Sequence, residues 1–185
     1  MKRCIHFSFS LLSLNISQAG FFDFLKKTAV DIELQGMPYY AQSNTQWCWI
    51  AVSQMAIQYK NSKKVSQCKL ISDTINKACC SNTSACNRGG FVEAVVPKYG
   101  LKVDRQLPNT SVVDASIASG KVPVMYLYNK KLGIEHYAII QAKYQNAKGY
   151  RVYDPWYGIL DLSNEQMKSR YVHEDYIWVG TTVVR

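Results

Sequence analysis

The stretch QWCW places a single cysteine, Cys48, between Trp47 and Trp49. Apolar residues then recur at helical spacing, which predicts that Cys48 lies on the inward face of the first turn of a helix. These apolar residues are Val52, Met55, Ala56 and Tyr59. The thiolate is the reactive form of a cysteine, and the unpaired N–H groups and dipole of a helix N-terminus favour an anion. Cys48 is therefore a candidate nucleophile.

A nucleophilic thiol needs a neighbouring base, for which histidine is a common choice. His136 opens the stretch HYAIIQAKY behind the glycine-containing turn LGIE, and its residue types predict a strand. The chain returns as YRVYDP, which ends at Asp154 before a proline. In an antiparallel hairpin the start of one strand and the end of the next lie at the same end of the sheet. Asp154 is therefore expected to orient His136 and to support its positive charge.

Gln42 lies six positions before Cys48, just outside the expected helix. Its side-chain amide and the backbone N–H of Cys48 are candidate donors to the oxyanion of a tetrahedral intermediate. Each of these residues alone has a plainer interpretation, because a buried helical cysteine is more often inert and an Asp-Pro pair is more often a turn former. His136 alone would be a structural strand residue, and His173 is interpreted as structural or surface-exposed. The combination favours acyl-transfer chemistry.

At these residues the chain resembles the bacterial papain-like cysteine proteases, a family that includes effector proteases of plant pathogens and lies near the staphopains and the double-glycine leader peptidases. The resemblance runs from MPYYAQSNTQWCWIAVSQMA through QCKL, ACC and GKVPVMYLY to GIEHYAII and RVYDPWYG. It implies a secreted cysteine peptidase with Gln42, Cys48, His136 and Asp154 as its working residues and no metal or organic cofactor. It also implies an α+β papain-like fold, with the nucleophile helix in an N-terminal helical half and the histidine and aspartate in a C-terminal antiparallel sheet or half-barrel.

The resemblance further implies a substrate cleft, for which the candidates are Trp47, Trp49, Glu135 and Trp156. We expect the two tryptophans beside the cysteine to lie in the core and in the wall of the cleft. Glu135 stands where similar proteins often have a small residue, which is expected to alter substrate access or charge preference. A protein or peptide is the expected substrate. Two alternatives stay open, namely a cell-wall amidase or other acyl-transfer toxin or deamidase, and a catalytically inactive binding module.

The N-terminus has the pattern of a secretory signal peptide. Lys2 and Arg3 precede an apolar run, and Ser17 and Ala19 form a small-x-small cleavage site. We expect cleavage near Ala19, export to the periplasm or the medium, and a single domain over residues 20–185. A first buried helix or an uncleaved anchor is the alternative. No later stretch of the sequence reaches membrane-spanning length.

The charge and composition of the chain limit the classes of binding partner that we expect. The formal net charge of the 185-residue chain is +9, which falls to +7 when Lys2 and Arg3 leave with the signal peptide. The remaining lysines are scattered without a basic helix or a stacking platform, so nucleic acid is not an expected partner. Gly89-Gly90 lacks the strand and motif of a phosphate-binding loop. A monomer is expected. Its activity is expected to be restrained by a proteinaceous inhibitor or immunity protein, by redox control of Cys48 or by restricted location.

Removal of Cys4 with the signal peptide leaves five cysteines, an odd number that leaves one thiol over. Four of them crowd into a segment of polar loop character: Cys68, Cys79, Cys80 and Cys86. In an oxidising compartment these four are expected to close two disulfides. Adjacent cysteines rarely pair, which leaves Cys68–Cys79 with Cys80–Cys86, or Cys68–Cys80 with Cys79–Cys86. Zinc is disfavoured because two CxxC knuckles are lacking.

Helical patterns come first along the chain and strand patterns later, an order typical of α+β proteins. Beyond the helix that starts at Cys48, short helices are expected within 89–100 and 109–121. Ser111 and Asp114 stand at capping-box spacing, and the candidate caps of the first helix are Ser43, Asn44 and Thr45. An extended segment is expected to end near Pro38, and strands are expected at 122–128, 136–144, 149–155 and 176–184.

Overall fold

The computed structural model describes residues 30–145, 149–169, 171–173 and 175–185. The predicted signal peptide, residues 1–19, lies outside this part of the chain, as does the start of the domain expected over 20–185. Within the described residues, no helix is long and apolar enough to cross a membrane.

Helix α2 (Cys48–Asn61) begins at Cys48, as the apolar spacing predicts. Its N-cap is Trp47, which makes no side-chain capping hydrogen bond, so the prediction of a cap at residues 43–45 is wrong. Those residues instead form a turn, in which the backbone N–H of Trp47 donates to the carbonyl of Asn44 at 3.1 Å. Because α2 is apolar on nearly every side, it is buried as a central helix.

Helix α3 (Gln67–Ile75) occupies part of the cysteine-rich segment, so the prediction of a loop there is wrong for its first half. The Ser66 side chain caps this helix by accepting a hydrogen bond from the backbone N–H of Lys69. Leu70 and Ile71 are buried against the core. The helical half is completed by η1 (Ser84–Cys86), α4 (Val92–Val95) and η2 (Val96–Tyr99), the last two within the range expected for a short helix.

The described residues form a seven-stranded antiparallel sheet in the order β2-β7-β3-β4-β5-β6, with β1 paired to β4. The strands are β1 (Val30–Glu33), β2 (Val103–Gln106), β3 (Val122–Asn129), β4 (Ile134–Tyr144), β5 (Gly149–Asp154), β6 (Gly158–Ser163) and β7 (Tyr176–Val184). The four strands predicted in the second half are confirmed. The expected extended segment contains β1, which ends at Glu33 rather than near Pro38. Strands β2 and β6 were not expected.

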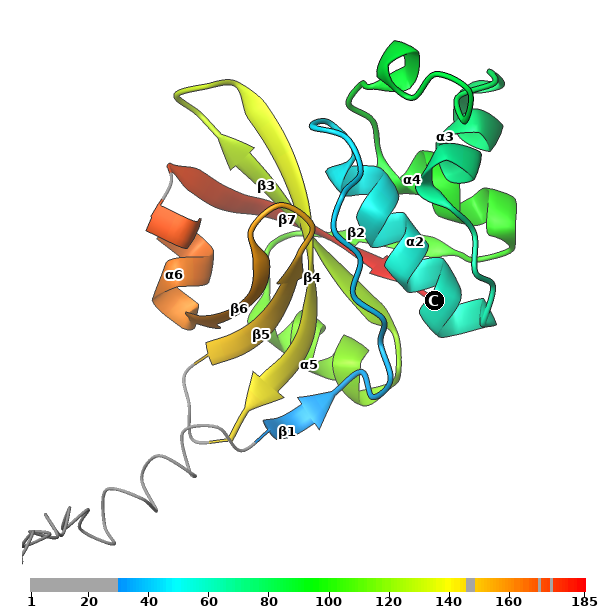
Figure 1. Ribbon diagram of the computed structural model, residues 1–185. Coiled ribbons are helices and arrows are strands. Elements are labelled where there is room, and N and C mark those ends of the chain that lie inside the picture. The colour runs from blue at the N-terminus through cyan, green and yellow to red at the C-terminus, as the bar shows by residue number, and fades with distance from the viewer. Residues whose placement is uncertain (1–29, 146–148, 170, 174) are drawn as a thin grey trace, which may run out of the picture.

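Two further helices flank the sheet. Helix α5 (Thr110–Ala118) is capped by the Asn109 side chain, which accepts from the backbone N–H of Ser111 at 2.8 Å, so Ser111 is not its cap. Helix α6 (Asn164–Ser169) and η3 (Tyr171–His173) lie between β6 and β7. Figure 1 shows α2, α3 and α4 gathered beside the sheet and α6 on the other side of the molecule.

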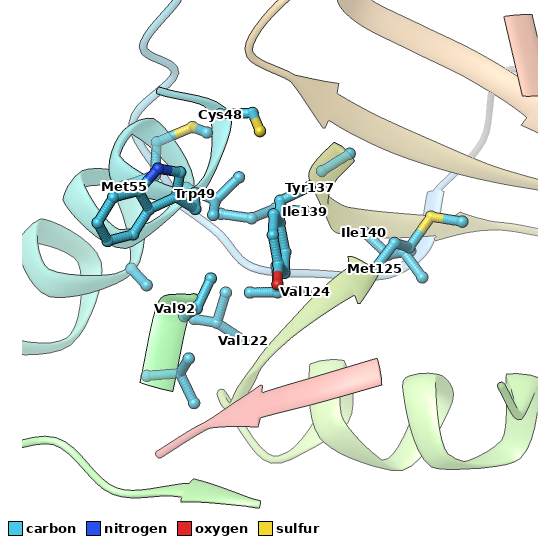
Figure 2. Close-up of a cluster of buried hydrophobic side chains, with 14 of the residues drawn as sticks. Cys48, Trp49, Met55, Val92, Val122, Val124, Met125, Tyr137, Ile139 and Ile140 are labelled. Atoms are coloured by element: carbon cyan, nitrogen blue, oxygen red, sulfur yellow. The ribbon is translucent and has the colours of Figure 1, made fainter. Parts of the chain in front are cut away.

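The core fills the space between the helical half and the sheet. Helix α2 contacts β4, α3 and α4, and its buried side chains meet Val124, Ile139 and other apolar residues of the central strands. Figure 2 shows Cys48 at the edge of this cluster, at the start of α2. The α+β arrangement expected from the sequence is therefore present, and it places α2, which begins at Cys48, directly against β4, which carries His136.

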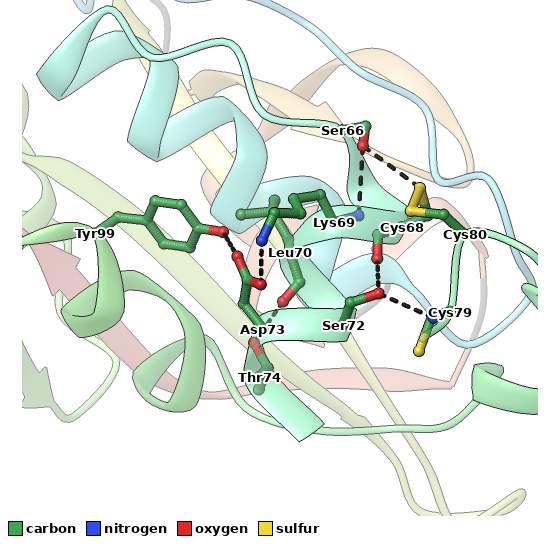
Figure 3. Close-up of polar contacts among 10 residues, drawn as sticks. All are labelled: Ser66, Cys68, Lys69, Leu70, Ser72, Asp73, Thr74, Cys79, Cys80 and Tyr99. Atoms are coloured by element: carbon green, nitrogen blue, oxygen red, sulfur yellow. Dashed lines mark hydrogen bonds and ion pairs between the residues drawn. A yellow bond between two sulfur atoms is a disulfide. The ribbon is translucent and has the colours of Figure 1, made fainter. Parts of the chain in front are cut away.

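The cysteine-rich segment contains two disulfides, Cys68–Cys80 and Cys79–Cys86, which is the second of the two pairings left open by the sequence. Cys79 and Cys86 are completely or almost completely buried. Figure 3 shows Ser72 linking the two bridges, because it donates to the carbonyl of Cys68 at 2.7 Å and accepts from the N–H of Cys79 at 3.0 Å. Cys48 is the free cysteine of the described residues.

The two disulfides are expected to differ in their effect on the cleft. Replacing either pair by alanines should lower the free energy of unfolding by about 2–4 kcal/mol, measured by urea titration. Loss of Cys79–Cys86 should also slow the alkylation of Cys48, because the Cys86 carbonyl accepts the indole N–H of Trp47 at 3.0 Å. Loss of Cys68–Cys80 is the matched control and should leave the alkylation rate unchanged. Equal effects on alkylation would contradict this assignment.

Candidate active site

Cys48 is the first residue of α2, and only 7% of its surface is exposed. The first-turn N–H groups of a helix have no carbonyl partners within the helix, so its N-terminus favours a negatively charged sulfur. The thiol is free rather than bridged, and it lines a cleft in the described residues. Its position therefore combines access to the cleft with the electrostatic field of a helix N-terminus.

His136 and Asp154 form a buried pair. The Nε2 atom of His136 lies 2.8 Å from Oδ2 of Asp154, the last residue of β5. The carboxylate is completely buried, and only 8% of the imidazole side chain is exposed. The antiparallel pairing of β4 with β5 brings the two residues together at one end of the sheet. His136 is the third residue of β4 rather than its first, because the strand begins at Ile134.

The His136 ring carries a proton at neutral pH. Burial alone lowers the pKa of this imidazole, but hydrogen bonds and attraction from Asp154 and Cys48 outweigh burial and raise the pKa to about 10. The side chain of Cys48 lines the same cleft as the ring and interacts with it electrostatically. Since Nε2 faces Asp154, Nδ1 is the nitrogen left for the sulfur. A buried imidazolium is thereby held between a carboxylate and a thiol.

Asp154 is ionised and fully hydrogen-bonded. Its Oδ1 accepts from the backbone N–H groups of Trp156 at 2.7 Å and Tyr157 at 2.9 Å. Its Oδ2 accepts from Tyr171 Oη at 2.6 Å in addition to His136. Burial raises the pKa of this carboxyl, but these hydrogen bonds and the charge of His136 more than offset burial and hold the pKa below its usual value.

Gln42 lies at the cleft, but its amide is engaged. Nε2 donates to the carbonyl of Asn44 at 2.8 Å and to the carbonyl of Thr45 at 2.9 Å, while Oε1 is buried without a hydrogen-bond partner among the described residues. The two carbonyls fix this orientation of the amide, because a flip would place oxygen against oxygen. Donation to an oxyanion therefore requires the amide to share or release one of these hydrogens, and the predicted role stays a prediction.

The cleft has a volume of about 670 Å³. Three of the four predicted cleft residues line it, namely Trp49, Glu135 and Trp156, together with Gln42, Cys48 and His136. Trp47 does not, because it is completely buried and its indole N–H is bonded to the Cys86 carbonyl. Trp49 donates its own indole N–H to the carbonyl of Arg88 at 3.0 Å.

Gly90 fits closely against the cleft wall. A Cβ atom at this position would lie 2.6 Å from the Trp49 ring, closer than van der Waals contact permits. Gly90 therefore serves close packing against Trp49, whereas Gly89 lines the same cleft with open space around it.

Two tyrosines that contact Asp154 were missed by the sequence reasoning. Tyr171 donates to the carboxylate, and Tyr39 donates to the backbone carbonyl of Asp154 at 3.0 Å. Both lie far from Asp154 along the chain or in a segment without a regular pattern, so no motif points to them. The described residues contain no group of three or more histidines, cysteines or acids that could hold a metal ion.

No family model matches the sequence, and no curated protein matches it. Among solved structures, the chain is similar to the peptidase domain of Streptococcus ComA, a bifunctional ABC transporter involved in a quorum-sensing pathway. The TM-score is 0.55 at 17% identity, over 80% of this chain and 96% of that one. It is also similar to a double-glycine motif protease from an AMS/PCAT transporter, solved with its leader peptide, with a TM-score of 0.56 at 14% identity over 84% and 95% of the chains. At these identities the likeness shows the fold, which is α+β and papain-like, as the resemblance in sequence implies.

Proposed function

We propose that the protein is an exported cysteine peptidase in which Cys48 attacks the carbonyl carbon of a peptide bond. His136 acts as the proton donor and acceptor, Asp154 orients His136, and Gln42 with the backbone N–H of Cys48 stabilises the oxyanion. The observation that carries the proposal is the buried His136–Asp154 pair, 2.8 Å apart, within reach of a free thiol at a helix start that opens into a cleft.

The chemistry follows from this charge arrangement. The thiolate forms a bond to the carbonyl carbon, and the electron pair of the carbonyl bond moves to its oxygen. When the tetrahedral intermediate collapses, the C–N bond breaks and the leaving amine takes the proton of His136. Neutral His136 then removes a proton from water as the water oxygen attacks the thioester carbon. The C–S bond of this second intermediate breaks, which releases the acid product and leaves Cys48 as a thiolate beside protonated His136. Asp154 stays ionised throughout.

The cleft has features that suit an extended peptide. Three of its lining residues are apolar side chains about half exposed or more: Leu132 at 59%, Ile134 at 46% and Trp156 at 54%. Exposed apolar groups gathered around a cleft favour apolar substrate side chains. The structurally similar AMS/PCAT protease was solved with a leader peptide. A peptide or protein is therefore the proposed substrate class.

Export is proposed from two features. The N-terminal sequence has the charged start, apolar run and small-residue cleavage site of a signal peptide. The two disulfides form and persist in an oxidising compartment. The free Cys48 sits apart from both bridges, buried beside His136.

Replacing Gln42 by alanine should lower kcat about 100-fold with little change in KM, because an oxyanion donor acts only on the transition state. Steady-state kinetics on a cleaved peptide measure both constants. Gln67→Ala is the matched control, because Gln67 also ties this segment, through the Ala41 carbonyl at 2.8 Å and the Ser43 N–H at 2.8 Å, but does not line the cleft. Equal losses of kcat in the two variants would show that Gln42 acts only by holding the turn at residues 43–45.

The proposed activity is tested by incubating the oxidised mature protein with unfolded casein, with a peptide library and with isolated cell-wall sacculi. Mass spectrometry of the products then identifies each bond that breaks. Cleavage of peptide bonds in casein or the library, absent in Cys48→Ala, is the expected result. Release of cell-wall fragments without peptide cleavage would contradict it in favour of an amidase.

A further inference from the structure

Tyr171 makes an unusual contact with the acid of the site. Its hydroxyl lies 2.6 Å from Oδ2 of Asp154, the same oxygen that His136 Nε2 meets at 2.8 Å. The tyrosine is completely buried and comes from η3, an element that contributes nothing else to the hydrogen bonds of the carboxylate. A buried hydroxyl that donates to a single carboxylate oxygen indicates a role in controlling the protonation and alignment of that carboxylate.

We infer that Tyr171 is a positioning residue that keeps Asp154 ionised and aligned with His136, and thereby sets the lowest pH at which the reactive form of Cys48 persists. This inference rests on the proposed function, because it assigns Tyr171 a task in the same proton-transfer site.

The contacts of the carboxylate explain why one hydroxyl matters. All four of its contacts are donors, two N–H groups on Oδ1 and the imidazole and phenol on Oδ2. A proton on either oxygen would therefore point at another donor. Because the group is completely buried, water cannot replace a donor that is removed. Without the Tyr171 hydroxyl, Oδ2 has room to be protonated.

The backbone beside Tyr171 is strained. Val172 has a φ of 51°, in the left-handed region, where a β-branched side chain is a genuine outlier. Such conformations persist only where the surrounding structure enforces them, and they cluster at functional sites. The strain next to Tyr171 therefore supports a role for η3 beyond the connection of α6 to β7.

The titratable groups around Asp154 determine how the site responds as the pH falls. The titratable groups that face it are His136 from β4, Tyr39 from the segment before α2 and Tyr171 from η3. Tyr157 after β5 and Tyr176 from β7 lie beside the ring of His136 and interact electrostatically with Tyr171, and Cys48 of α2 acts through His136. Burial and Asp154 raise the pKa values of Tyr39 and Tyr171, so both stay protonated donors in acid. The pKa of the Asp154 carboxyl is held below its usual value, so this carboxyl is the group among them that gains a proton as the pH falls, and His136, with its pKa raised to about 10, is already protonated.

The test is the rate of Cys48 alkylation by iodoacetamide as a function of pH, in the wild type and in Tyr171→Phe. The hydrogen bond from Tyr171 lowers the pKa of Asp154, so loss of this bond raises that pKa. As the pH falls, Asp154 is then protonated at a higher pH than in the wild type. The imidazolium of His136 loses the negative charge beside it at that higher pH. We expect the acid midpoint of alkylation to move up by about one pH unit. A midpoint unchanged in folded Tyr171→Phe would overturn the inference.

Two controls sharpen this comparison. Tyr150→Phe removes another hydroxyl bonded to a carboxylate, that of Asp114 at 2.8 Å, remote from the cleft, and should leave the midpoint unchanged. In an Asp154→Asn background, Tyr171→Phe should cause no further shift, because the carboxylate it acts on is gone. A full further shift there would overturn the proposed route through Asp154.

Measurements on the wild-type protein distinguish failure of the inference from failure of the proposed function. Alkylation that rises only near pH 8.5, as for an ordinary thiol, would overturn the proposed function and the inference with it. Carbon NMR of labelled aspartate in the wild type keeps the inference testable should Tyr171→Phe not fold. An Asp154 carboxyl that titrates at or above its ordinary value would overturn the inference even where Cys48 is activated.

Discussion

Replacing Cys48 by alanine is expected to lower kcat/KM for peptide cleavage by at least about 10⁴-fold, with the fold intact. In the proposed mechanism the sulfur forms the covalent bond to substrate, and removal of a nucleophile from such a constellation costs roughly 10⁴- to 10⁶-fold. Cleavage of a fluorogenic peptide found by library profiling measures the loss. Residual activity within tenfold of the wild type would contradict the role of Cys48.

The fold of Cys48→Ala should hold because little volume is lost. Cys48 is buried at the edge of the core, and no disulfide depends on it. The urea midpoint is therefore expected to stay near that of the wild type. Because Cys48 is the free cysteine of the described residues, a thiol titration of the oxidised mature protein should fall to the background level in this variant.

Replacing His136 by glutamine is expected to lower kcat/KM by about 10⁴-fold. Glutamine keeps an N–H donor for Asp154 but has no proton to give the leaving amine. In the proposed mechanism the imidazolium is the proton donor, and its pKa is raised to about 10, so activity should decline only as the pH rises past that value. The pH profile of kcat/KM with the same fluorogenic peptide measures both effects.

His136→Ala provides the structural comparison. It leaves the completely buried Asp154 carboxylate without its charged partner, which should cost about 3–5 kcal/mol of unfolding free energy. A loss of activity in His136→Gln at near-normal stability therefore reports on proton transfer rather than on folding. Retention of substantial activity in either folded variant would contradict the assignment of His136.

The sequence predicted the parts of the fold that depend on local pattern. Apolar spacing after Cys48 predicted α2, and stretches rich in valine, isoleucine and tyrosine predicted the strands that carry His136 and Asp154. These patterns are strong because the elements are central and buried on most sides. Antiparallel pairing of these two strands predicted that His136 and Asp154 would meet.

The elements that the sequence did not predict are those with weak patterns. The edge strand β2 is the polar sequence VDRQ, half-exposed or exposed along its length, and β6 alternates at the opposite edge of the sheet. Helix α3 was hidden by the polar and cysteine-rich composition around it, although Ser66 caps it. Edge and surface elements carry few buried residues, so periodicity alone identifies them poorly.

The site shows the same division. Spacing pointed to Gln42, but only the structure reveals that its amide donates to the carbonyls of Asn44 and Thr45. Tyr171 reaches Asp154 through a strained turn at Val172. Both features depend on how distant or irregular segments pack, and neither residue type nor spacing encodes that packing.

The most direct test of an activated Cys48 is the intact mass of the oxidised mature protein after treatment with an epoxysuccinyl thiol-protease inhibitor. This reagent labels a thiolate held beside an imidazolium in a peptide-binding cleft. The account predicts one adduct on the wild type and none on Cys48→Ala or His136→Gln. A correctly folded wild type that remains unlabelled would contradict it.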